Sequence, residues 1–387
     1  MKVRLELRRW GGAVQGAVLA KRRELDERRS ILVVLRSELG ATGLGEAAPL
    51  PGYSPDTLDE AWQALERSSP EPLLEAARAR GLAALAGALD AQQLAASARF
   101  ALETAVLDAV AQEGAWHGLL GWSCDMVKPY GEAGQASDHV RRGQQMHRSG
   151  LGGLVGVEAS RASALALHAR GLGTIKLKAS GVDPAGEASW LRELGRELGA
   201  VLRVDLNGAL ALERAPAALE AYAAAGVELV EEPCAGAALL ELGAGPVPWC
   251  ADEALLDTAL GERLLAHPGC AGLVLKPSLL GGIGRCLGLA KRAIEAGKRA
   301  ILSHCFEGPV GLAAVAELAL AVGAMERAAG RAPLAMGVDQ HAGLAAYPEV
   351  VLSQLPESSS EGPLSILDRE RTGLGIDAEA LLARLGS

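Results

Sequence analysis

The chain has 387 residues and a formal net charge of −9, with 49% hydrophobic and 22% charged residues. This length predicts about two domains, each large enough for a packed core. The acidic balance argues against nucleic acid or an anionic membrane surface as the main partner. The most apolar stretch, residues 311–325, is interrupted by Glu317 and is shorter than the ~20 residues of a membrane span, so we expect no membrane segment.

The cysteines and the amino-terminal residues favour a cytoplasmic protein. The six cysteines are scattered without Cys-x-x-Cys spacing, so neither a disulfide framework nor a zinc site is indicated. The first ten residues, MKVRLELRRW, are charged from position 2 and contain no apolar signal core. We therefore expect a soluble cytoplasmic protein, and both a monomer and a homo-oligomer remain open.

Residues 1–120 mix strand-like and helix-like patterns. Polar and apolar residues alternate over 2–8, and an apolar run follows at 30–35, which predicts two strands. Ala-rich segments with helical periodicity occupy 56–67 and 96–113. Together these patterns predict a small α+β domain.

From about residue 151, short β-branched runs alternate with helix-like stretches. The runs are LVGVE (154–158), TIKLK, VLRVDL, VELVEEP, VPWCADE, GLVLKPS and RAILSH. Helix-like segments such as 187–198 and 210–224 lie between them. This alternation predicts parallel βαβ units, and roughly 200 residues of it suit a closed barrel better than a doubly wound open sheet, which stays the alternative.

Charged residues end the predicted strands in an orderly series. They are Lys176, Lys178, Asp205, Glu231, Asp252 and Lys276. The steps from Lys178 onward are 27, 26, 21 and 24 residues, so one group arrives per βα unit at the carboxyl rim, where barrel chemistry takes place. Only eight of the 38 basic residues are lysines, so a lysine at such a position calls for a chemical reason.

The chemistry of these strand ends is coherent. The carboxylates of Asp205, Glu231 and Asp252 are hard oxygen ligands that suit Mg²⁺, and without His or Cys beside them zinc and copper are disfavoured. A metal-free carboxylate cluster is the alternative, but three close anions repel without a cation. Lys176 and Lys178 lie two apart on a strand and face the same side, and lysine can act as a base where arginine cannot. The residues suggest proton abstraction next to a carboxylate, with a metal stabilising the enediolate.

The order of the motifs resembles the enolase superfamily, muconate lactonizing subgroup. The motifs are Lys176-x-Lys178, Asp205-x-Asn207, Glu231-Glu232-Pro233, Asp252-Glu253 and Lys276-Pro277. In addition, GEAAPLPGYS at 45–54 is similar to the GE-x-x-PLPGFS segment of o-succinylbenzoate synthases. The resemblance implies an α/β fold, a modified TIM barrel of (β/α)7β type with an α+β capping domain. We predict the cap at 1–120, the barrel with the active site at 121–350, and a carboxy-terminal return to the cap at 351–387.

The resemblance also implies roles for the lysines and for the metal. Lys178 would take the proton α to the carboxylate and then protonate the departing hydroxyl on the same face. Lys276 would lie opposite as a cation, and the like charge of Lys176 would favour the neutral form of Lys178. The implied reaction is syn-dehydration of 2-succinyl-6-hydroxy-2,4-cyclohexadiene-1-carboxylate to 2-succinylbenzoate in menaquinone biosynthesis, with Mg²⁺ bound by the three carboxylates and Mn²⁺ as a substitute.

Candidate contacts to this small carboxylate substrate are Tyr53, Asn207, Ser303 and Glu307, and the basic loop 21–23 is a further candidate. Relatives often carry SSxIES on the seventh strand, where this chain reads SHCFEG at 303–308. Gly-Val-Asp at 337–339 resembles the family's GLD, and the next two residues, Gln-His, depart from it. These departures concern positions that contact the substrate in relatives, whereas the metal ligands and the lysines match the family pattern.

Three other functions are weighed against the synthase. An N-succinylamino acid racemase or a dipeptide epimerase would use Lys178 and Lys276 as two bases on opposite faces, although the Asp-x-Asp typical of dipeptide epimerases is missing. A muconate cycloisomerase fits PLPGYS less well. A non-catalytic relative that keeps the fold would have no reason to retain three carboxylates and three lysines.

Overall fold

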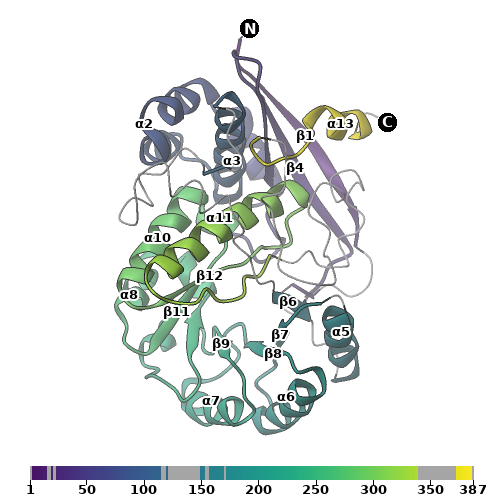
Figure 1. The fold of residues 1–387 in the computed structure, drawn as a ribbon, viewed down its shortest axis with the longest axis vertical. Helices are drawn as coiled ribbons and strands as arrows, with labels where there is room; N and C mark the ends of the chain where they lie inside the picture. Colours follow the sequence, from purple (N-terminus) through teal and green to yellow (C-terminus); the bar gives the residue numbers. More distant parts are fainter. Residues whose placement is uncertain are drawn as a thin grey trace.

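The computed structural model describes residues 2–14, 19–20, 23–114, 119–120, 149–152, 157–169, 171–338 and 372–385. Two parts are visible in Figure 1: a cap of long strands and helices at the amino-terminal end, and below it a curved parallel sheet surrounded by helices. Helices α10 (Ile283–Glu295) and α11 (Pro309–Ala328) lie where the two parts meet.

The cap is a three-stranded antiparallel sheet covered by helices. Its strand order is β1-β4-β5, and a separate two-stranded ribbon joins β2 to β3. The strands are β1 (Arg4–Ala13), β2 (Leu19–Ala20), β3 (Arg23–Glu24), β4 (Glu27–Arg36) and β5 (Thr42–Ala47). The helices are α1 (Leu58–Glu66), α2 (Pro70–Ala91) and α3 (Ala96–Glu113). The strands predicted over 2–8 and 30–35 and the helices predicted over 56–67 and 96–113 are confirmed.

Strand β5 was not predicted, because its sequence TGLGEA holds two glycines that lower strand propensity. The packing explains them. A Cβ atom on Gly43 would lie 1.9 Å from the carbonyl oxygen of Ala105, and one on Gly45 would lie 1.9 Å from that of Ala101. The glycines therefore let α3 lie directly against the sheet.

Helix α3 is buried on every side from Ser97 to Ala111. Its polar side chains bind separate parts of the protein. Arg99 donates to the carbonyl oxygen of Gly281, and the carboxylate of Glu103 accepts from the backbone N–H groups of Ile283 (2.6 Å) and Gly284 (3.0 Å) at the start of α10. Helix α3 thus joins the core of the cap to the helices of the barrel.

The second part is a seven-stranded parallel sheet in the order β12-β11-β10-β9-β8-β7-β6. The strands are β6 (Ser149–Gly152), β7 (Thr174–Lys178), β8 (Val201–Asp205), β9 (Leu229–Glu231), β10 (Trp249–Ala251), β11 (Cys270–Leu275) and β12 (Arg299–Leu302). A doubly wound sheet reverses its strand order at a switch point, whereas here the order follows the chain throughout. The barrel is therefore favoured over the open sheet.

Helices alternate with these strands. Besides α10 and α11 they are α5 (Val157–Ala169), α6 (Pro184–Leu198), α7 (Ala215–Ala224), α8 (Thr258–Ala266) and the short α9 (Pro277–Leu280). Short 3₁₀ turns are η3 (Leu212–Arg214), η4 (Gly236–Leu240) and η5 (Glu253–Leu256). Beyond β12, the N–H of Gly337 donates to the carbonyl of Leu302 (2.8 Å) and its own carbonyl accepts from His304 (2.9 Å), a parallel bridge where an eighth strand belongs. These features bear out the modified TIM barrel with a cap.

The strand predicted over 154–158 is wrong at its end, because Val157 and Glu158 already belong to α5, while residues 154–156 lie outside the described residues. The strand β6 lies earlier, at Ser149–Gly152. A short apolar run between glycines has too few residues to separate the period of a strand from the first turn of a helix.

Helix α11 is long and apolar enough to cross a membrane by length and composition alone. It is longer than the stretch 311–325 considered from the sequence, because it runs from Pro309 to Ala328. However, 89% of its apolar window is buried inside the protein, and the helix packs against α10, β12 and β5. Its apolar surface is therefore explained by the core.

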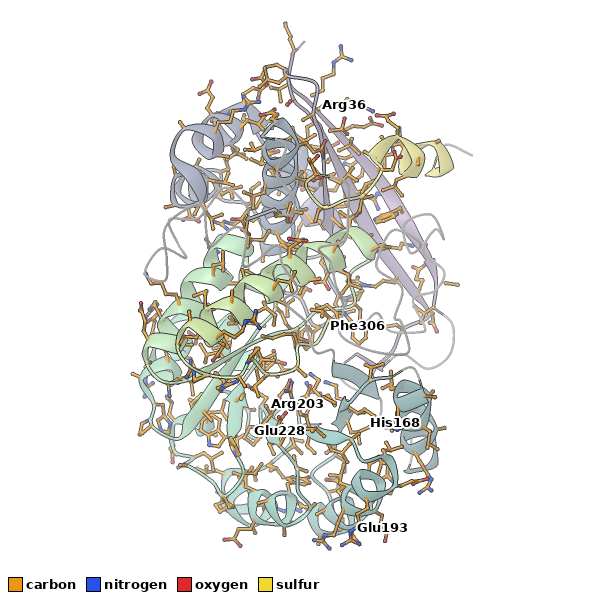
Figure 2. The ribbon with its side chains drawn as sticks, in the orientation of Figure 1. Arg36, His168, Glu193, Arg203, Glu228 and Phe306 are labelled. Atoms are coloured by element: carbon orange, nitrogen blue, oxygen red, sulfur yellow. The ribbon has the colours of Figure 1, made fainter. Side chains whose placement is uncertain are left out.

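Arg28 of β4 fastens the cap to the barrel. It is 1% exposed, and its guanidinium donates to the carbonyl oxygens of Ala48, Pro49 (2.7 Å), Cys305 (3.2 Å) and Phe306 (2.6 Å). Phe306 is visible in Figure 2 at the junction of the two parts. One side chain thus joins the loop after β5 to the loop after β12.

The end of the described chain lies against the cap. Helix α13 (Ala378–Leu385) contacts β5 and lies beside the cap in Figure 1. Glu379 pairs with Arg36 at 2.8 Å, and the N–H of Leu374 donates to Asp108 of α3 at 2.8 Å. The predicted boundary at 350 lies outside the described residues, and the one at 120 is followed by residues 121–148, which are not described, so the three-part division stays a prediction.

Glu46 of β5 is fully buried and accepts hydrogen bonds from the hydroxyl of Ser30 (2.6 Å) and from the N–H groups of Gly308 and Gly311 (2.9 Å each). Burial raises the pKa of Glu46 from 4.5 to about 7, although these donors act in the opposite direction. The folded protein therefore binds more protons than the unfolded chain between these two values, and the free energy of unfolding falls as the pH rises through that window.

We expect the stability of the wild type, relative to a Glu46→Gln variant, to fall by roughly 2 kcal/mol between pH 5 and pH 8. Glutamine does not titrate, so subtracting the stability of the variant removes the contribution of all other ionisable groups to the pH dependence. Urea unfolding at the two pH values measures the difference. An unchanged difference between the two proteins would show that Glu46 titrates alike in the folded and unfolded chains.

Candidate active site

The parallel register brings the charged strand ends together. Lys178 of β7 pairs with Asp205 of β8, which pairs with Glu231 of β9, so three neighbouring strands present these side chains at one level. Asp252 follows β10 directly, and Lys276 follows β11. The expected rim of charged groups is therefore present.

Asp205, Glu231 and Asp252 form the carboxylate cluster of this site. Each offers one oxygen, and these oxygens all lie within 4.8 Å of one another. The three residues are between 0% and 4% exposed. Such a buried all-oxygen donor set suits a hard divalent cation, so the cluster could hold a metal ion.

Each carboxylate is contacted by a lysine. Lys176 Nζ lies 2.7 Å from Glu231 Oε2 and 3.3 Å from Asp205 Oδ2, while Lys178 Nζ lies 2.6 Å from Asp205 Oδ2. Lys276 Nζ lies 2.5 Å from Asp252 Oδ2. The side chain of Lys178 is 27% exposed, compared with 7% for Lys176 and 9% for Lys276, so Lys178 is the most accessible of the three.

These contacts affect the carboxylates unevenly. For Asp205, burial acts to raise the pKa, but the ammonium groups of Lys178 and Lys176 outweigh it and hold the pKa well below its usual range. For Asp252, burial dominates and raises the pKa to about 7, even though Lys276 acts in the opposite direction. The negative charge is thus stabilised more strongly at Asp205 than at Asp252.

Tyr53 and Asn207, two of the candidate substrate contacts, lie beside the lysines. Lys178 Nζ donates to Asn207 Oδ1 at 2.8 Å, and Lys276 Nζ donates to the Tyr53 hydroxyl at 2.5 Å while lying 4.9 Å from the centre of its ring. Asn207 has a left-handed backbone (φ 45°), a conformation that asparagine tolerates better than most residues. Asn207 follows Asp205 by two residues, and its backbone N–H donates to Asp205 Oδ1 at 3.0 Å.

Ser303 and Glu307 lie apart from the carboxylate cluster in the contacts of the described chain. Glu307 is 1% exposed, and its oxygens accept from the Ser278 hydroxyl and from the N–H of Cys305 (2.5 Å). Ser303 lies at the bridge to Gly337. Both residues belong to the loop that Arg28 holds, where they shape its backbone.

Two carboxylates in the site were not singled out by the sequence. Glu232 accepts from the N–H groups of Asp252 (2.7 Å) and Ala254 (3.0 Å), and burial together with the charge of Glu253 raises its pKa to about 9. Glu253 accepts from both Tyr53 and Asn207. Glu232 lies in the Glu-Glu-Pro motif and Glu253 in the Asp-Glu motif. The motifs therefore pointed to both residues, but the sequence alone assigned neither of them a role.

Some candidates lie outside the described residues. Lys21 and Arg22 of the basic loop are among them, as are positions 339–341 with the departure from GLD. Arg23 belongs to β3, but its side chain is not described.

Comparisons with known proteins agree with this geometry. The family described as Enolase C-terminal domain-like matches residues 159–352, and the MenC, N-terminal domain family matches residues 3–83. The chain is similar to an aromatic dipeptide epimerase of Herpetosiphon aurantiacus, with 30% identity over 306 residues, 77% of this chain and 80% of the relative. It is also similar to an o-succinylbenzoate synthase of Desulfotalea psychrophila, with 28% identity over 312 residues, 72% of this chain and 79% of the relative.

A solved structure shares the fold. The dipeptide epimerase from Methylococcus capsulatus, complexed with Mg and the dipeptide L-Arg-D-Lys, matches with a TM-score of 0.72 at 23% identity, covering 90% of this chain and 93% of that one. The chain belongs to the enolase superfamily, and it is an enzyme of that superfamily, a lyase or an isomerase. The MenC match and the synthase relatives support the o-succinylbenzoate synthase-like subgroup.

We expect Asp205→Asn to lower the affinity for Mg²⁺ and for Mn²⁺ at least about tenfold, because it removes one charged donor from the cluster. Isothermal titration calorimetry measures this affinity. Glu241→Gln, a change at an exposed acid away from the cluster, serves as the control and should bind both ions like the wild type. Equal affinities for all three proteins would mean that the cation binds elsewhere.

Proposed function

We propose that the protein is a cytoplasmic o-succinylbenzoate synthase that dehydrates 2-succinyl-6-hydroxy-2,4-cyclohexadiene-1-carboxylate to 2-succinylbenzoate in menaquinone biosynthesis. Its cofactor is Mg²⁺, which Mn²⁺ can replace. The observation that carries the proposal is the arrangement of two lysines around one buried carboxylate cluster, with Lys178 accessible and Lys276 held by a tyrosine of the MenC-like segment.

Lys178 acts as base and then as acid. Its neutral amine removes the proton from the ring carbon that bears the carboxylate. The resulting ammonium then gives a proton to the neighbouring hydroxyl, which leaves as water on the same face, and the ring becomes aromatic. When bound by Asp205, Glu231 and Asp252, Mg²⁺ supplies positive charge beside the substrate carboxylate and so favours removal of the neighbouring proton.

Lys276 and Lys176 act through their charge. Lys276 lies between Asp252 and the Tyr53 hydroxyl and stays an ammonium facing the opposite side of the substrate ring, where it attracts the electron-rich intermediate. Lys176 is sealed from solvent and keeps positive charge beside Asp205 and Glu231. Tyr53 and Asn207 border the substrate, and Ser303 and Glu307 shape the loop that Arg28 holds.

We expect Lys178→Ala to lower kcat for the dehydration by roughly 10²–10⁴-fold, the range for loss of a general acid–base group. Ultraviolet absorbance follows the formation of the aromatic product with and without Mg²⁺. Lys291→Ala, at an exposed lysine of α10, is the matched control and should keep full activity. A Lys178→Ala enzyme as fast as the control would assign the base to another residue.

A dipeptide epimerase is the second candidate, favoured by the 30% identity to the aromatic dipeptide epimerase. In that reaction Lys178 and Lys276 would be two bases on opposite faces of one α-carbon. The synthase needs Lys276 only as a cation, because a single base serves both steps.

Proton exchange separates the two candidates. For the synthase, we expect turnover of the cyclohexadiene substrate and no deuterium uptake into aromatic dipeptides or N-succinylamino acids in D₂O. Mass spectrometry and ¹H NMR measure the uptake. Rapid deuterium uptake with inversion, together with no dehydration, would establish the epimerase instead.

A further inference from the structure

Glu253 is a carboxylate beside the cluster that the proposed reaction leaves without a role. It follows Asp252 at the start of η5. Its Oε1 accepts two hydrogen bonds, one from Asn207 Nδ2 at 2.6 Å and one from the Tyr53 hydroxyl at 3.1 Å. Its two partners come from different parts of the fold, since Asn207 follows β8 of the barrel and Tyr53 belongs to the cap.

Each partner of Glu253 also contacts one of the two lysines that face the substrate. Asn207 accepts from Lys178 at 2.8 Å, and Tyr53 accepts from Lys276 at 2.5 Å. A continuous path of hydrogen bonds therefore connects Lys178 to Lys276, and Glu253 is its midpoint.

The donors and acceptors fix the direction of each bond in this path. Lys178 donates to the amide oxygen of Asn207, so the NH₂ group of Asn207 is turned toward Glu253. The Lys276 ammonium can only donate, so the Tyr53 oxygen accepts from it while the Tyr53 O–H points to Glu253. A group that accepts from both an amide and a phenol is required at the midpoint, and the carboxylate of Glu253 meets this requirement.

We propose that Glu253 is a positioning residue that orients Asn207 and Tyr53 and thereby holds Lys178 and Lys276 on opposite sides of the substrate. This inference rests on the proposed function, and it concerns the geometry of the lysines, not a proton transfer by Glu253. It acts through its two partners, since in the described contacts Glu253 makes no ion pair with either lysine.

The rate of the proposed reaction depends on this positioning. Lys178 has to reach first a carbon-bound proton and then the neighbouring hydroxyl, and a displacement of about 1 Å can cost roughly 10²-fold in rate. Glu253 also connects the barrel to the loop that carries Tyr53. The placement of Lys276 therefore depends on correct docking of the cap segment.

Kinetics of five proteins test the proposal: wild type, E253A, E253Q, Y53F and the double variant E253A/Y53F. At saturating Mg²⁺ we expect E253A to lower kcat by about 10- to 100-fold while KM changes less than about threefold, because the substrate still binds but the lysines are misplaced. E253Q should recover most of kcat, since its amide oxygen can accept both bonds. E253A should cost less in the Y53F background than in the wild type, because half of the path is already lost.

Further measurements exclude a general structural effect. E262A, at an exposed acid paired with Arg292 on the outer helices, is the matched control and should match the wild type in kcat and KM. Calorimetry should give E253A and the wild type the same affinity for Mg²⁺, and circular dichroism should give them the same unfolding temperature within a few degrees.

Specific results would overturn the proposal. These are a kcat of E253A within twofold of the wild type, additive effects of E253A and Y53F, or a loss of Mg²⁺ affinity that accounts for the whole decrease in kcat. Failure of the wild type to dehydrate the substrate would instead count against the proposed function. In that case the same five proteins would be compared by deuterium uptake into dipeptides, with the same non-additivity supporting the path and additivity overturning it.

Discussion

Three buried carboxylates within 4.8 Å of one another repel, and the surrounding site is organised to offset this repulsion. The parallel register puts Asp205 and Glu231 at one level, and an ammonium group reaches each member of the cluster. The same concentration of negative charge that needs these lysines also makes the cluster attractive to a divalent cation. The candidate metal site and the lysines are therefore two parts of one electrostatic arrangement.

Much of the fold and of the candidate site could be predicted from the sequence, because both depend on local pattern and regular spacing. Steps of 21 to 27 residues between charged strand ends follow from the length of a βα unit, and they correctly brought Lys178, Asp205, Glu231, Asp252 and Lys276 together. The predicted helix 96–113 agrees with the observed one to the residue. Where a segment was short and apolar, as at 154–158, the pattern held too few residues to decide.

The features that the sequence did not reveal depend on contacts between distant parts of the chain. The path through Glu253 needs Tyr53, two hundred residues earlier, and Arg28 binds carbonyl groups nearly 280 residues away. Strand β5 exists with two glycines because α3 approaches it closely. No periodic pattern encodes such contacts, since they arise from packing of the cap on the barrel.

The loops at the junction are where closely related reactions can diverge. A carboxylate cluster between two lysines serves elimination or epimerisation equally well, so substrate selection belongs to the segments that border it. Arg28 binds backbone carbonyls in the loop with Ala48 and Pro49 and in the loop with Cys305 and Phe306, and so fixes the main chains of both loops.

The burial of α3 from Ser97 to Ala111 has a mechanical consequence. Many two-part enzymes admit substrate by rotating one rigid body away from the other about a hinge. Here such a rotation would break the hydrogen bonds that Arg99 and Glu103 make with Gly281 and with the start of α10. These buried contacts favour a cap and a barrel that stay together as one body.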